Sequence, residues 1–95
     1  MTQWTVLVPP RLYEEFAQLS GPGRKAVHEV LALLAEDPRN AATSREPITG
    51  AELRQISTEP TADTGDRISI LYRVHDPADA SETGHVEIIY VISGP

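Results

Sequence analysis

The chain has 95 residues, 40% of them hydrophobic and 23% charged, which is typical of a single globular domain (residues 1–95) with one small core. Its net charge of −6, from 8 basic and 14 acidic residues, has the wrong sign for a protein that holds a polyanion by long-range attraction. The absence of cysteine excludes disulfides and thiolate chemistry, and three dispersed histidines predict neither a metal site nor another cofactor. No apolar run approaches the roughly 20 residues of a membrane helix, and the first residues lack a signal-peptide pattern. We therefore expect a cytoplasmic protein without a membrane partner.

The first part of the chain predicts one short strand followed by two helices. Residues 2–8 are rich in β-branched and aromatic residues and stop at a Pro-Pro pair, as strands do. Residues 10–20 carry apolar side chains at helical spacing, and Gly21-Pro22-Gly23 is expected to end that helix. Residues 24–37 predict a second helix, so the two form a helical hairpin. The apolar stripe of the second helix consists of Val27, Val30, Leu31 and Leu34.

The second part predicts a connecting loop at residues 39–50 and then three strands. These strands span residues 52–58, 66–75 and 85–93, and a turn at residues 77–84 joins the last two into an antiparallel hairpin. The predicted fold is therefore α+β, in the order β-α-α-β-β-β, with the two-helix hairpin packed on one face of a mainly antiparallel four-stranded sheet. Alternation assigns the core face of the sheet to Ile68, Ile70, Tyr72, Val74, Val86, Ile88, Tyr90 and Ile92. We expect the core to include Phe16, Leu31, Leu34, Ile70, Tyr72 and Ile88.

The opposite face of the sheet is predicted to carry an apolar patch formed by Leu71, Ile89 and Val91. A monomer usually covers such a patch, which favours a bound partner, a homodimer contact or a ligand, although a simple half-exposed sheet fits equally well. Arg67 and Arg73 share this face and are candidate phosphate-binding residues.

Arg54 is a third candidate for the same phosphate-binding group. The alternation of its strand, residues 52–58, is too poor to show which face it takes. Its place beside Arg67 and Arg73 is therefore left open.

His75 and His85 flank the predicted turn, so we expect them to lie near each other at the end of the hairpin. Two neighbouring imidazoles are candidates for a general base or a proton relay near neutral pH. The simpler interpretation is that both are solvated, as histidines beside turns usually are. No glycine-rich phosphate loop, Gly-x-Ser-x-Gly turn or His-Glu-x-x-His motif is present.

The order of several segments resembles the RelE/ParE superfamily of bacterial toxins. These segments are Leu-Leu-Ala-Glu-Asp-Pro-Arg-Asn at Leu33–Asn40, Glu52-Leu53-Arg54, Gly65-Asp66-Arg67, Leu71-Tyr72-Arg73-Val74, and the apolar run Val86–Ser93. The resemblance covers nearly the whole chain. It implies the toxin half of a bacterial type II toxin–antitoxin system, with a small antitoxin protein as partner. In this superfamily the RelE-like branch cleaves messenger RNA on the ribosome, and the ParE-like branch inhibits DNA gyrase.

The resemblance also implies a chemistry: a metal-free endoribonuclease that helps the ribose 2′-hydroxyl attack the adjacent phosphate. Arg54 matches a basic position of the family, and Arg67 roughly matches another, although the family arginine corresponds to Ser69 here. The family's last strand runs on into a basic stretch, whereas this sequence has Ser93-Gly94-Pro95. We therefore expect a toxin-family protein with weakened or lost RNA cleavage. The alternatives are a non-enzymatic protein-interaction domain on the same scaffold and a fully active mRNA interferase.

Overall fold

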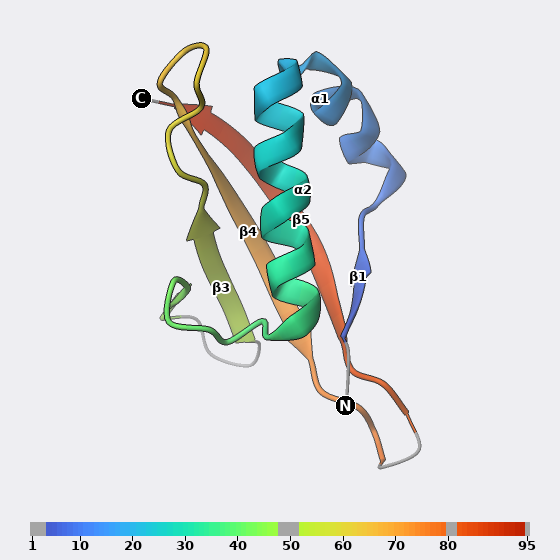
Figure 1. Cartoon of the computed structure of the whole chain (residues 1–95). Coiled ribbons are helices and arrows are strands. Elements are labelled where there is room, and N and C mark those ends of the chain that lie inside the picture. Colours follow the sequence, from blue (N-terminus) through green and yellow to red (C-terminus); the bar gives the residue numbers. More distant parts are fainter. Residues whose placement is uncertain (1–3, 48–51, 80–81, 95) are drawn as a thin grey trace.

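The computed structural model describes residues 4–47, 52–79 and 82–94. It has an α+β fold with two helices and a five-stranded mixed sheet. The helices pack against one face of the sheet (Figure 1). The sheet has the strand order β1-β5-β4-β3-β2, so the β4–β5 hairpin lies at its centre. The predicted α+β class and the packing of helices on one face are confirmed. Within the described residues, no helix is long and apolar enough to cross a membrane.

The helical layer begins with a short 3-10 turn, Pro10–Leu12, which leads into α1, Tyr13–Gln18, and then α2, Gly21–Glu36. The prediction that Gly21-Pro22-Gly23 ends the first helix was wrong, because these residues form the first turn of α2. Ser20 is the N-cap of α2, and its Oγ accepts a hydrogen bond from the Gly23 backbone N–H at 3.1 Å. Proline is tolerated in a first helical turn, where its missing N–H has no helical partner to lose.

The sheet contains five strands, with the bounds β1 Thr5–Leu7, β2 Ser44–Arg45, β3 Glu52–Ser57, β4 Arg67–His75 and β5 His85–Gly94. Two details differ from the predicted four-stranded, mainly antiparallel sheet. β1 pairs in parallel with β5, and the loop predicted at residues 39–50 contains the additional strand β2, which pairs with β3. A two-residue edge strand has no hydrophobic alternation, so no local pattern could have revealed β2.

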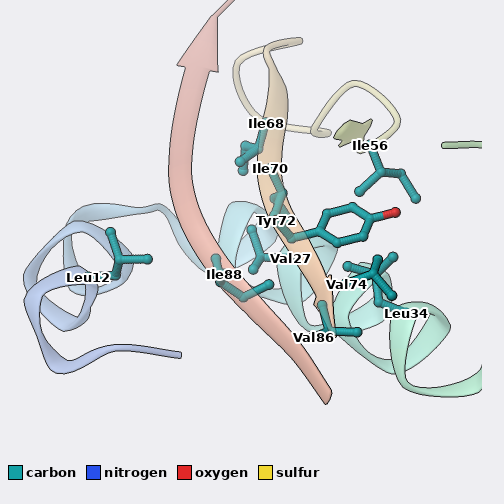
Figure 2. Close-up of a cluster of buried hydrophobic side chains, with 10 residues drawn as sticks. All are labelled: Leu12, Val27, Leu34, Ile56, Ile68, Ile70, Tyr72, Val74, Val86 and Ile88. Atoms are coloured by element: carbon teal, nitrogen blue, oxygen red, sulfur yellow. The ribbon is translucent and has the colours of Figure 1, made fainter. Parts of the chain in front are cut away.

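The core lies between the helices and the central strands, and Figure 2 shows its cluster of buried side chains. Leu34, Ile70, Tyr72 and Ile88 are 0% exposed, as predicted. Phe16 and Leu31 are instead only partly buried and pack against the edge of this cluster. The remaining members of the buried cluster are Leu12, Val27, Ile56, Ile68, Val74 and Val86.

A β-bulge in β5 changes which residues face the core. Tyr72 pairs with Ile88 and Leu71 pairs with Tyr90, so Ile89 has no partner in the register. An extra residue reverses the alternation beyond it. The predicted core positions Tyr90 and Ile92 are therefore 47% and 50% exposed, which corrects the sequence prediction. Val91, which was predicted to lie on the opposite face, packs against the core instead.

Candidate functional site

The face of the sheet away from the helices is called here the open face. Residues in register share a face, and alternate residues along each strand take opposite faces, so the buried core positions define the other set. The open face carries Thr5, Leu7, Leu53, Gln55, Ser57, Arg67, Ser69, Leu71, Arg73, His75, His85, Glu87, Tyr90 and Ile92, with Ile89 at the bulge.

The structure does not bring the three candidate arginines together. Arg54 is in register with Tyr72, which is buried in the core, so Arg54 lies on the helical side of the sheet. Arg67 and Arg73 do share the open face. They stand six positions apart on β4, however, which corresponds to about 20 Å at about 3.3 Å per residue. A single phosphate group cannot contact both.

Arg54 is held by polar neighbours near the C-terminal end of α2. Its Nε donates to Thr43 Oγ1 at 3.2 Å, and its Nη1 forms an ion pair with Glu52 Oε2 at 3.2 Å. The Arg54 and Glu52 side chains are each only 16% exposed. The positive charge of Arg54 is therefore already neutralised within the protein.

Glu52 also binds Arg39, a residue that the sequence did not single out. Arg39 donates to both carboxylate oxygens of Glu52 at 2.8 Å and to those of Asp76 at 3.0 and 3.1 Å. Its guanidinium lies 5.5 Å from the centre of the Trp4 ring. The hydrogen bonds from Arg39 hold the pKa of Glu52 below its ordinary value. This network joins segments distant in the sequence and supports the fold, and local spacing carries no signal of it.

His75 and His85 stack at the end of the β4–β5 hairpin, as their positions beside the turn suggested. Their ring centres are 4.3 Å apart and the rings are inclined by 15°. His75 Nε2 lies 3.1 Å from Glu87 Oε1, which is within hydrogen-bond distance. Arg73 is in register with Glu87, and its buried Nε has no hydrogen-bond partner in the described structure. These four residues form what we call the histidine cluster.

The histidine cluster has the components of acid–base chemistry near a cation. When His75 Nε2 carries the proton, its N–H donates a hydrogen bond to Glu87 Oε1, and Nδ1 is left as an acceptor that can take a proton from a substrate. Arg73 lies two positions from His75, about 7 Å along β4, and adds to the same face a cation of the kind that binds anions. Among the described residues, no three His, Asp or Glu side chains are arranged to hold a metal ion.

The half of the open face beyond the bulge carries large apolar side chains beside the polar residues Ser69 and Arg67. Tyr90 and Ile92 are about half exposed, and the half-buried Leu71 and Ile89 lie beside them at the bulge. The candidate partner-binding residues Leu71 and Ile89 therefore remain on this face, whereas Val91 does not. The sequence missed Tyr90 and Ile92 because its alternation gave no sign of the bulge.

A separate groove of about 690 Å³, called here the edge groove, runs between α2 and residues 56–62. Glu46 N donates to Leu53 O on the β2 side of β3, while Thr58 N donates to Ile68 on the β4 side. By alternation, the backbone groups of Ser57 point away from β4. β2 pairs only with the residues before it, so no strand in the described ranges covers Ser57 on that side.

Comparisons with protein-family models, with curated proteins and with solved structures found no match to this chain. The resemblance to the RelE/ParE superfamily therefore remains a prediction from the order and spacing of the sequence segments.

Proposed function

We propose that this chain is a RelE/ParE-like protein of a type II toxin–antitoxin system that functions chiefly by binding a partner protein, with RNA cleavage weakened or lost. The observation that carries the proposal is the division of the open face. Its cations are dispersed, whereas its large apolar side chains are contiguous and half exposed.

Tight binding of RNA requires several cationic side chains close together. Each phosphate that a protein neutralises contributes through counterion release, so one isolated arginine contributes little. Arg54 is paired with Glu52, and Arg67 lies about 20 Å from Arg73 along β4. The overall charge of −6 adds a repulsive background. These features favour weak RNA binding.

Binding of a protein suits the same surface better. Aromatic and aliphatic side chains with a nearby arginine are the usual anchors of an interface. Tyr90 and Ile92 supply such anchors, and Arg73 lies on the same face. The uncovered backbone of Ser57 in the edge groove offers a second element, because an extended segment can add to a strand edge. An antitoxin that wraps its toxin with an extended segment and a helix would use both.

The test is purification of the tagged chain from its native host, followed by mass spectrometry and light scattering. The proposal predicts a stoichiometric complex with a small protein encoded beside this gene. A monodisperse monomer at high concentration, with no such partner recovered, would contradict it.

A second candidate function is metal-free phosphodiester cleavage at the histidine cluster. The hydrogen bond from His75 to Glu87, beside Arg73, is the observation that favours it. General acid–base steps contribute roughly 10²–10⁴-fold each, so His75→Ala should abolish most of any cleavage measured in EDTA. Tyr13→Phe, on the helical side, is the control that should retain it. Cleavage that survives His75→Ala, or that requires a metal, would exclude this candidate.

A further inference from the structure

A small apolar pocket lies between the two helices, on the side of the molecule away from the open face. It has a volume of about 200 Å³, and most of its lining is aliphatic or aromatic. The polar exceptions are Arg24 and His28. The apolar lining comes from the segment after β1, from both helices and from the link between them. It consists of Val8, Tyr13, Phe16, Leu19, Val27 and Leu31. We call this site the helix pocket.

Arg24 and His28 stand four positions apart on α2, so both side chains lie on the same face of that helix, one turn apart. Both residues are exposed. Within the described part of the chain, neither side chain has an ion pair or a side-chain hydrogen bond. Glu14 and Glu15 belong to α1 but do not line the pocket. An unpaired cation therefore stands at the rim of an apolar depression in a protein whose net charge is −6.

We propose that the helix pocket binds a small organic carboxylate with an unbranched apolar tail. Charge complementarity supplies the first argument, because the Arg24 guanidinium presents paired N–H donors that match a carboxylate. Volume supplies the second. A depression of about 200 Å³ is smaller than most ligand pockets, so it suits a short unbranched tail. Octanoate, a carboxylate with a short unbranched tail, is the probe.

The lining explains why the tail enters the pocket rather than remaining in water. Phe16, Leu19 and Leu31 are only partly buried, so an aliphatic tail would remove their remaining apolar surface from solvent. A protein helix is about 10 Å across and would not fit a pocket of this volume. The observations therefore favour a small molecule over a protein segment at this site.

The experiment is a two-dimensional NMR titration of the ¹⁵N-labelled chain with octanoate, below its micelle concentration, and with 1-octanol, which has the same tail without charge. We expect saturable shifts confined to residues 8–31, and binding of octanoate about tenfold tighter than that of octanol. Arg24→Gln should weaken octanoate about tenfold and change octanol less than twofold. The matched control Arg45→Gln, on the distant strand β2, should change neither.

Several outcomes would overturn the proposal. Equal affinities of the wild-type chain for octanoate and octanol would show that Arg24 does not bind the carboxylate. This comparison needs no variant. Equal affinities of wild type and Arg24→Gln for octanoate would do the same. Shifts that do not saturate, or that spread over the sheet, would show non-specific adsorption. The dispersion of the same spectra reports whether each variant is folded.

Discussion

The hydroxyl of Tyr72 joins the centre of the sheet to the end of the helical layer. Its ring is 0% exposed, and the hydroxyl donates a hydrogen bond to the carbonyl oxygen of Pro38, just after α2. Tyr72→Phe keeps the buried ring and removes only this donor. Pro38 is itself fully buried, so its carbonyl would be left without that partner. Leaving a buried polar group unsatisfied costs about 1–3 kcal/mol.

We therefore expect Tyr72→Phe to lower the free energy of unfolding by about 2 kcal/mol. For a domain of this size that corresponds to a fall in Tm of roughly 8–16 °C. Urea unfolding followed by circular dichroism, together with a thermal scan, measures both quantities. Tyr13→Phe is the matched control, because Tyr13 is 59% exposed and its change should stay within about 0.5 kcal/mol. Equal stability of the two variants would refute the reasoning.

Titration of the buried Tyr72 hydroxyl is expected to make the stability of the protein depend on pH. Burial raises the pKa of Tyr72 above its ordinary value of 10.0. Above pH 10 the unfolded chain therefore loses this proton before the folded chain does, and stability falls as the pH rises through the folded pKa. Tyr72→Phe should flatten that alkaline decline. An unchanged decline in the variant would mean that other groups cause it.

Three further changes test the core, the ion-pair network and the arginines. Leu34→Ala should cost about 2–5 kcal/mol in urea unfolding, because Leu34 is fully buried, and a cost below about 1 kcal/mol would contradict the core. Hydrogen bonds from Arg39 lower the pKa of Glu52 below its ordinary value of 4.5. The stability that ionised Glu52 contributes is therefore present above pH 4.5 and is lost as the pH falls through the pKa of Glu52 in the folded protein. Glu52→Gln should reduce this loss of stability at acid pH, which denaturation measured from pH 7 to 2 would show. Expression of the wild-type chain in a bacterial host should slow growth little. Growth arrest that is relieved by Arg54→Ala, Arg67→Ala and Arg73→Ala together, in a folded variant, would establish the active nuclease instead.

The sequence predicts the parts of this fold that a local pattern determines. Strict alternation from Ile68 to Val74 identified the core face of β4 because each buried residue is followed by a polar or half-exposed one. In β5 the run Ile88–Ile92 is apolar throughout, so it cannot indicate where the extra residue of a bulge enters. The position of the bulge depends on how β5 pairs with β4, and strand pairing is a property of the whole sheet. The parallel contact of β1 with β5 was unpredictable for the same reason.

In the candidate site too, some features follow from a local sequence pattern and others depend on strand pairing. The proximity of His75 and His85 could be predicted because both flank one turn. The position of Glu87 beside His75 depends on the register of β4 against β5, and the face of Arg54 depends on its pairing with Tyr72. Neither relation has a local signal in the chain. Residue type identified the candidate cations, and only the register showed that they are dispersed.

The affinity of the co-purified partner for two tyrosine variants tests the central claim most directly. Tyr90→Asp places a charge on the open face, and Tyr13→Asp places one on the helical side, at residues that are 47% and 59% exposed. With folding verified by circular dichroism, calorimetry should show Tyr90→Asp binding about 30-fold more weakly than wild type, as expected for an interface anchor. Tyr13→Asp should bind within twofold of wild type. Equal affinities for Tyr90→Asp and wild type, or a larger loss for Tyr13→Asp, would show that the partner does not bind the open face.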